Sequence, residues 1–368
     1  MKIFKNIAFL VVGLLLFSCT EDKAILVDDT LLNYEIPKEP VNTDYNVGAI
    51  YTRFAKNNNV NLVETPSIGK FNDINDNNLP TVYEKHVIQA QTAGVDFFIF
   101  NLRSTFNQDS YDLDKKYIDN LQTAPNASEM KFAFSYNFSE MKLSITDKIE
   151  LVLLTPTFLK DFELMLPYFQ KANYMKINGK AVVYINNSHN LFANDNPALY
   201  QQLRTQMRAL GVELYLIGMQ EQWTPTLRFD FRFVGCVDAL TVTNYALINK
   251  SFYDRFYFFH KFIDLAWSGY KDKDGVEYNH KATLAKYNIE FVPTISPSYN
   301  AIAAANYDIP KNADWFKANC NIARRASGAN KLVIIDSFND WNLDTQIESA
   351  TSYGDEYLKI LRSEFKLK

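Results

Sequence analysis

Short apolar runs rich in β-branched and aromatic residues alternate with longer amphipathic segments along most of the chain. The longer segments have helical spacing, and the clearest helices are predicted at Pro80–Ala93, Pro197–Leu210 and Asp314–Ala326. Each opens on a proline or an acidic residue and closes at or near a glycine, which is how helices commonly start and stop. The short runs predict eight strands, at Val47–Thr52, Val95–Phe100, Lys131–Tyr136, Ala181–Ile185, Val212–Ile217, Val237–Thr243, Glu290–Ile295 and Leu332–Ser337.

The spacing of these elements suits repeated strand–helix units. "Ala-Gly-Val-Asp" precedes the second strand and "Leu-Gly-Val-Glu" runs into the fifth, as expected where a helix ends at a glycine and a strand follows. Eight such units with no break in composition predict an α/β fold, a single (β/α)8 barrel over residues 47–368. The alternative is a doubly wound open sheet, but neither a G-x-G-x-x-G motif nor a P-loop follows the first strand.

The N-terminus has the pattern of an export signal. Lys2 and Lys5 precede the apolar run from Ile7 to Phe17, which is of signal-peptide length and short for a membrane span. The run ends in Leu-Phe-Ser-Cys, which resembles the lipobox of bacterial lipoproteins and implies a signal peptide over residues 1–18 and lipidation of Cys19. Residues 19–46 are polar with few periodic apolar positions, so we expect a flexible tether. In bacterial lipoproteins a residue other than aspartate directly after the lipidated cysteine favours anchoring in the outer membrane, and in this chain that residue is Thr20.

Charge and composition narrow the range of partners. Without the signal peptide the chain has 36 basic and 42 acidic residues, a net charge of about −6, which argues against nucleic acid as a partner. The four histidines are scattered, and none stands in a zinc-ligand spacing, so we expect no metal and no other cofactor. Aromatic residues make up 15 % of the chain. Although most rings fill a core in any large domain, some are expected near the surface, where they can stack on sugars.

In a (β/α)8 barrel, chemistry occurs at the carboxyl ends of the strands. Planar hydrogen-bonding groups and aromatic rings follow these predicted ends and would suit a polyhydroxylated ligand such as a polysaccharide or oligosaccharide. The candidate binding residues are Asn101, Arg103, Asn137, Asn186, Trp223, Asn244, Tyr245, Tyr299, Asn339, Trp341, Gln346 and Glu348, with Arg53 after the first strand.

The segment after strand eight carries a family resemblance. "Ser337-Phe338-Asn339-Asp340-Trp341", followed by "Thr345-Gln346-Ile347-Glu348", resembles the Ser-Phe-Asn-Glu-Trp-His-Glu-Gly-Thr-Gln-Ile-Glu signature of the glycoside hydrolase family 99 endo-α-mannosidases. It is also similar to the Asn-Glu-Trp-x-Glu-Gly motif of the WbsX-like proteins of polysaccharide loci. The stretches 86–100 and 168–180 agree with the same family, so the resemblance covers about Val47 to Glu348.

The resemblance implies a retaining glycosidase that acts inside α-mannan-type chains with two carboxylates three residues apart. The first acts as a base on the sugar 2-hydroxyl, and the second is the general acid on the leaving oxygen. In this chain the first position is Asp340, one methylene shorter than glutamate, and the second is Leu343, which carries no proton. Asp344 stands where the family has glycine. If the chain is an enzyme, the acid must come from a neighbouring carboxylate, for which Asp344 and Glu221 are the candidates.

Three functions therefore stay open. The chain is an envelope glycosidase with a displaced acid, a glycan-binding lipoprotein on a degenerate hydrolase barrel, or a lipoprotein with a structural role unrelated to sugars. Turnover of a mannan-type glycan, retention of glycan without product, or neither would distinguish them.

Overall fold

The computed structural model describes residues 33–53, 64–69, 75–141, 149–150, 155–193, 195–220, 230–242, 259–300, 308–309 and 311–367. The chain divides into two units, Met1–Pro37 and Lys38–Lys368. Only the last five residues of the first unit are described, so the predicted signal peptide and Cys19 lie outside the described residues. None of the described helices has the length and apolar character needed to cross a membrane.

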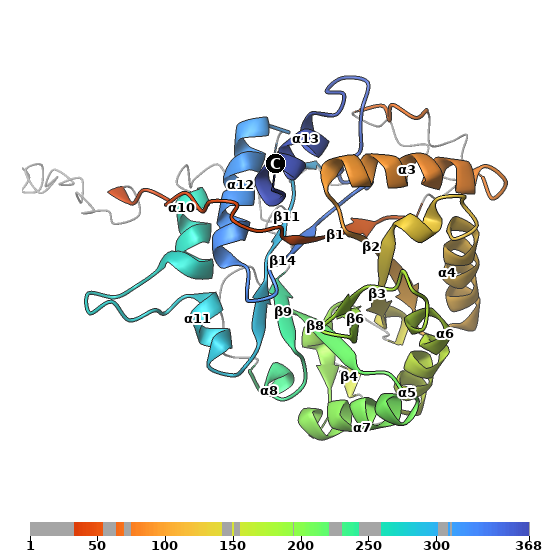
Figure 1. Cartoon of the computed structure of the whole chain (residues 1–368). Helices are drawn as coiled ribbons and strands as arrows, with labels where there is room; N and C mark the ends of the chain where they lie inside the picture. The colour runs from red at the N-terminus through yellow and green to blue at the C-terminus, as the bar shows by residue number, and fades with distance from the viewer. Residues whose placement is uncertain are drawn as a thin grey trace, which may run out of the picture. The chain divides into compact units, whose positions relative to one another are not determined.

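The second unit is built on a parallel sheet whose strands overlap all eight predicted ones (Figure 1). Each strand is a run of mostly buried apolar residues, because both faces of a parallel sheet are covered. The strands are β1 (Asn46–Tyr51), β2 (Phe97–Arg103), β3 (Lys131–Asn137), β6 (Lys180–Ile185), β8 (Leu214–Gln220), β9 (Ala239–Val242), β10 (Glu290–Val292) with β11 (Thr294–Ile295), and β14 (Leu332–Ile335).

The seventh predicted strand is divided at Pro293 into β10 and β11. Its first half pairs with β9 and its second half with β14, which in turn pairs with β1. Proline has no N–H for a ladder, but its carbonyl oxygen still accepts a 3.0 Å hydrogen bond from the N–H of Ile334. The pairings thus form a nearly closed parallel barrel. The predicted (β/α)8 fold is confirmed, and the open-sheet alternative is wrong.

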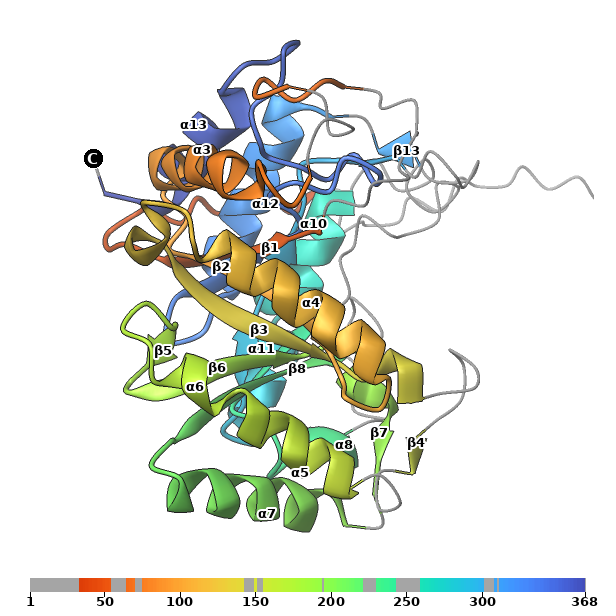
Figure 2. The same ribbon diagram turned by 90° about the vertical axis from the view of Figure 1, so that its right-hand side faces the viewer.

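Helices surround the strands, as Figures 1 and 2 show for α3, α4, α5 and α7. The three predicted helices are found to within one residue at each end as α3, α7 and α12. The described helices are α3 (Leu79–Ala93), α4 (Gln108–Leu121), α5 (Thr155–Leu164), α6 (Leu166–Phe169), α7 (Asn196–Ala209), α8 (Asp230–Phe233), α10 (Phe259–Asp264), η8 (Leu265–Gly269), α11 (His280–Ala285), α12 (Ala313–Ala326) and α13 (Glu356–Phe365), with single 3-10 turns η2 (Ala127–Glu129), η3 (Ser139–Met141) and η5 (Ser188–Asn190).

Shorter strands pair with a strand of the barrel or with one another. β5 (Lys176–Ile177) forms a hairpin with β6, β4 (Ile149–Glu150) pairs with β7 (Leu191–Phe192), and β12 (Tyr299–Asn300) pairs with β13 (Asp308–Ile309). The β12–β13 pair follows strand seven, so it lies on the end of the barrel where the chemistry is expected.

The glycines that close α3 and α7 act as predicted, but the one after α12 has another role. Gly94 and Gly211 have φ of 74° and 82°, a left-handed conformation that favours glycine after a helix. Gly328 has an ordinary φ, and a Cβ there would lie 2.0 Å from the side chain of Glu290. This third glycine is therefore needed for close packing rather than for a turn.

Much of the aromatic content fills the core beneath the loop that follows strand eight, residues 336–350, which we call the strand-eight loop. The ring of Phe338, just after β14, lies 4.9 Å from that of Phe98 and is stacked on Tyr51 at 6.0 Å. His86 on α3 meets the same two rings, Tyr51 and Phe338, edge-on. These contacts fix the start of the strand-eight loop on strands one and two and on α3.

Candidate active site

The carboxyl ends of strands one, two and eight come together because the strands are parallel. Tyr51 is in register with Phe100, so Thr52 follows strand one at the level of Asn101 on strand two. The hydroxyl of Thr52 donates a long 3.4 Å hydrogen bond to Oδ2 of Asp340. Asp340 therefore lies at the end of the barrel where Asn101 and the other candidates follow their strands, which we call the mouth.

The polar residues that end strands two and three are joined around Asp114, a buried carboxylate on α4. Arg103 donates to both Asp114 oxygens, at 2.8 and 2.7 Å, and Asn101 donates to one of them at 3.2 Å. Asn137 donates to the amide oxygen of Asn101 at 3.0 Å, and Arg53 lies 3.8 Å from Asp114. The sequence predicted four of these five residues at the mouth, but it did not predict Asp114.

The structure describes only some of the candidates that follow strands four to seven. Asn186 is half-buried after β6, where its backbone N–H donates to Tyr136. Tyr299 is buried in β12 and packs with Ile309 and the partly buried Leu343. Four candidates, Glu221, Trp223, Asn244 and Tyr245, lie outside the described residues, so they stay predictions.

Asp340 closes a tight turn with its own side chain. Its Oδ1 accepts the backbone N–H groups of Asn342 and Leu343, at 3.2 and 3.3 Å. Its own N–H donates to the hydroxyl of Ser337 at 2.7 Å. Burial raises the pKa of the Asp340 carboxyl above its ordinary value, and the two backbone N–H groups and Thr52 partly offset this. The carboxylate is thus both a turn residue and a base of increased strength.

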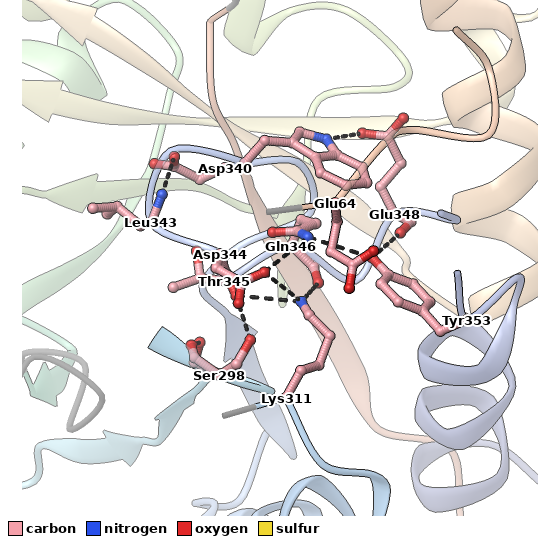
Figure 3. Close-up of polar contacts among 12 residues, drawn as sticks. Glu64, Ser298, Lys311, Asp340, Leu343, Asp344, Thr345, Gln346, Glu348 and Tyr353 are labelled. Atoms are coloured by element: carbon pink, nitrogen blue, oxygen red, sulfur yellow. Dashed lines mark hydrogen bonds and ion pairs between the residues drawn. The ribbon is translucent and has the colours of Figure 1, made fainter. Parts of the chain in front are cut away.

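Asp344 points away from Asp340. Figure 3 shows its side chain directed at Lys311, whose Nζ lies 3.4 Å from Oδ1, and Gln346 donates to the same oxygen at 3.2 Å. The residue has a φ of 54°, in the left-handed region where the family signature has glycine. With 6 % of its surface exposed, Asp344 is a buried counter-ion of Lys311.

Lys311 precedes α12, and no sequence pattern singles it out. Its ammonium lies 5.3 Å from the ring centres of both Tyr353 and Tyr357, which follow the strand-eight loop. Burial lowers its pKa to about 8, against the opposing effect of Asp344 and of Glu64. At neutral pH this is therefore a buried cation held among oxygens and aromatic faces.

Glu348 is fully buried with both oxygens engaged. Oε1 lies 2.9 Å from Nε2 of His86, and Oε2 accepts the indole N–H of Trp341 at 2.7 Å. The other imidazole nitrogen of His86 lies 2.8 Å from the hydroxyl of Tyr51, whose pKa is raised well above its ordinary value, chiefly by burial. This chain of contacts braces the loop against α3 and β1.

Asn339 and Gln346 are also buried inside the loop's own network. The side chain of Asn339 exchanges two hydrogen bonds with the backbone of Thr52, at 2.7 and 3.1 Å. Gln346 donates to Asp344, and its backbone carbonyl accepts from Lys311. The four loop candidates Asn339, Trp341, Gln346 and Glu348 are at most 4 % exposed, so their contacts here support the loop. Among the described residues, no group of three histidine, cysteine or acidic side chains could hold a metal.

Known proteins resemble this chain in sequence and in fold over most of its length. The sequence model of the family described as "Glycosyltransferase WbsX" matches residues 64–361. A solved structure titled "Glycoside hydrolase-like protein" is 36 % identical, covers 93 % of this chain and 99 % of its own, and superposes with a TM-score of 0.79. No curated protein matches.

Two structures of the family 99 endo-α-mannosidase of Bacteroides thetaiotaomicron share the fold. The one in complex with bis-tris propane has a TM-score of 0.61 at 14 % identity, over 88 % of this chain and 96 % of that chain. The other has a TM-score of 0.58 at the same identity, over 88 % and 97 %. The chain therefore belongs to the WbsX family, and its glycoside-hydrolase-like barrel has the same fold as the family 99 endo-α-mannosidases.

Proposed function

We propose that this protein binds α-mannan-type or related polysaccharide at the mouth of the barrel and hydrolyses it weakly or not at all. The observation that carries the proposal is Leu343, an apolar side chain packed against Tyr299 and Ile309 where the mannosidase signature has its general acid. Asp344, the neighbouring carboxylate, is paired with Lys311 and buried. Neither residue is placed to protonate a leaving oxygen beside Asp340.

The polar groups around the mouth support glycan binding. Arg53, Asn101, Arg103 and Asn137 present amide and guanidinium groups from three successive strands, and Asn101 is exposed. Amides both donate and accept, and fixed planar groups of this kind suit the paired hydroxyls of a sugar ring. Asp114 contacts three of these side chains, Arg53, Asn101 and Arg103, so the surface is formed before a ligand arrives.

Asp340 favours a second candidate function, that of a glycoside hydrolase. Its carboxylate stands at the family's base position, and its raised pKa increases its strength as a base. In this case the missing proton comes from a carboxylate elsewhere, for which Glu221 is the remaining candidate from the sequence. Activity of this kind would be lost on a single carboxylate change.

The proposal includes an envelope location. The lipobox-like Leu-Phe-Ser-Cys sequence supports lipidation of Cys19, and Thr20 supports anchoring in the outer membrane. A lipid-anchored barrel would present its mouth to polysaccharides of the envelope or of the surroundings. The remaining interpretation is a lipoprotein with a purely structural role, which would neither retain nor cleave glycans.

The test is a panel of polysaccharides scored for retention in affinity gels and for release of reducing ends. We expect retention of a mannan-type glycan with little or no release. Asn101→Ala should weaken retention, whereas the matched change Gln201→Ala, at an exposed position on α7, should leave it intact. Efficient release would favour the hydrolase, and a protein that neither retains nor cleaves any glycan would contradict the proposal.

A further inference from the structure

The hydrogen bonds of the Lys311 ammonium group go to the strand-eight loop. Its Nζ lies 3.2 Å from the carbonyl oxygen of Asp344, 3.0 Å from that of Gln346 and 3.4 Å from Oδ1 of Asp344. An ammonium has three N–H donors, so these oxygens account for its donor capacity. The side chain is 10 % exposed, so water has little access to replace them.

The same group also joins the loop to the segment that leads into α13. Tyr353 and Tyr357 face the ammonium with their rings, and the hydroxyl of Tyr353 donates to the carbonyl of Glu348 at 2.7 Å. Figure 3 shows Lys311 at the centre of this arrangement, between Asp344, Gln346 and Tyr353. Both ends of the segment from Asp344 to Glu348 are therefore tied to Lys311, either directly or through one tyrosine.

The backbone conformation and the buried charge of Asp344 explain why a lysine is needed at position 311. At a φ of 54° an L-residue is strained unless its surroundings hold it, and aspartate is among the few residues that adopt this conformation. Ser298 and Lys311 both donate to its carbonyl, while Lys311 also neutralises its carboxylate. A buried carboxylate at this position needs a cation, and the family's glycine would not.

We propose that Lys311 is the positioning residue of the site: by holding the carbonyls of Asp344 and Gln346, it fixes the loop that carries Asp340 and thereby sets glycan affinity at the mouth. This inference rests on the proposed glycan binding. Lys311 acts through the loop and not by contact with the sugar. The loop already touches the mouth through the contact between Asp340 and Thr52, so a displaced loop changes the binding surface directly.

Two variants separate positioning from charge balance. Lys311→Met removes the donors and leaves the Asp344 carboxylate buried without a cation, so we expect lower thermal stability and at least tenfold weaker mannan binding. Lys311→Met combined with Asp344→Gly removes both charges and gives position 344 the residue suited to its φ. We expect this double variant to regain stability but to keep weakened binding. The carbonyl of Gln346 loses the Lys311 donor, and the carbonyl of residue 344 keeps only the hydroxyl of Ser298.

The fluorescence of Trp341 tests the role of Lys311 without glycan, and so independently of the proposed glycan binding. Trp341 lies in the loop and donates to Glu348, so its fluorescence, taken as the difference from Trp341→Phe, reports the loop's conformation. We expect this spectrum to change in both Lys311 variants. Lys317→Met is the matched control, since Lys317 is a half-exposed lysine on α12 paired only with Asp314 in the described contacts.

Each outcome supports or overturns the role of Lys311. Weak mannan binding and a changed Trp341 spectrum in the double variant, with near-native melting temperature, support positioning by Lys311. Native affinity and a native spectrum in the double variant overturn it, since charge balance alone would then explain the lysine. If the natural protein retains no glycan, the proposed function fails, and the Trp341 spectrum of the double variant still decides whether Lys311 positions the loop.

Discussion

The backbone N–H of Leu343 donates a 3.3 Å hydrogen bond to Oδ1 of Asp340, so the residue in the acid position helps to hold the carboxylate in the base position. The N–H of Asn342 donates to the same oxygen at 3.2 Å. Such a turn needs a carboxylate or amide oxygen whose group is joined to the backbone by one methylene. Aspartate and asparagine have this geometry, and glutamate does not. The shorter acid in this chain is therefore coupled to the tight turn that it closes.

The turn and the charge of Asp340 can be separated by substitution. Asp340→Asn keeps an acceptor for both N–H groups, so we expect a free energy of unfolding close to that of the natural protein. Asp340→Ala removes the acceptor and should cost about 1 kcal/mol. Urea unfolding of both variants measures this, and equal losses in the two would contradict the turn role. Any residual hydrolysis should disappear in both, because neither has a base.

Much of the fold could be predicted because buried parallel strands leave a strong signal. All eight strands were found as apolar runs, and the helix ends at Gly94 and Gly211 followed from the preference for glycine after a helix. The boundaries were less accurate where strand ends carry polar residues. Strand two runs to Arg103, three residues beyond the predicted end, because its last residues pair with strand three while their side chains contact Asp114.

The site was predicted only in part, because its key contacts join distant segments. The motif after strand eight pointed to Asp340, Trp341 and Glu348, but nothing in the sequence around Lys311 or Asp114 distinguishes them from solvated charges on a loop and a helix. Their roles depend on partners brought together by the barrel. His86 had a weak signal, since it shares the apolar face of α3 with Tyr83 and Val87.

The buried contact between His86 and Glu348 should be a major contributor to stability. His86→Leu leaves the Glu348 carboxyl buried with Trp341 as its remaining side-chain partner, and we expect a loss of about 3–5 kcal/mol. The exposed pair Lys115–Asp119 is the control, and Lys115→Met should cost less than about 1 kcal/mol. Chemical denaturation measures the free energy of unfolding of both variants. A similar small loss in the two would show that the contact between His86 and Glu348 contributes little to stability.

The lowered pKa of Lys311 predicts how stability depends on pH. The folded protein releases this proton near pH 8, whereas the unfolded chain keeps it to about pH 10.5, so the unfolded state binds more protons between these values. The free energy of unfolding should therefore rise with pH across this interval. Relative to Lys311→Met, the natural protein should gain about 2 kcal/mol between pH 7.5 and 9.5.

The comparison with the variant is needed because buried tyrosines act in the opposite sense. Burial raises the pKa of Tyr353 and Tyr357, so the folded state holds protons that the unfolded state loses above about pH 10. Both proteins contain these tyrosines, and their effect largely cancels in the difference. A flat or falling difference between pH 7.5 and 9.5 would contradict the burial of a charged lysine.

Lipidation at Cys19 is tested in the cell. Sulfur is the expected acyl acceptor, so Cys19→Ser should abolish incorporation of labelled palmitate and move the protein out of the detergent phase. Cys236 and Cys320 are buried and free, so Cys320→Ser serves as the control and should leave labelling unchanged. Undiminished labelling of the Cys19 variant would reject the lipobox interpretation.

The missing acid can be restored by substitution at Leu343. An α-mannoside leaves poorly unless its oxygen is protonated, and general acid catalysis contributes about 10²- to 10⁴-fold. Leu343 packs against Tyr299 and Ile309, so a glutamate in its place would lie in apolar surroundings that raise its pKa and keep it protonated. Leu343→Glu should therefore increase hydrolysis of an unactivated oligomannoside, while Leu343→Gln, of the same shape without the proton, should not.

Comparison of two substrates shows whether the gain comes from the acid. An aryl mannoside with a good leaving group needs little protonation, so Leu343→Glu should change its turnover much less than that of the oligosaccharide. Adding Asp340→Asn to Leu343→Glu should remove the gain on both substrates, because the base is then absent. Robust turnover of the oligosaccharide by the natural protein would mean that another acid is in place. Since Asp344 is bound to Lys311, we expect Asp344→Asn to leave such turnover largely intact, and its abolition would instead identify Asp344 as that acid.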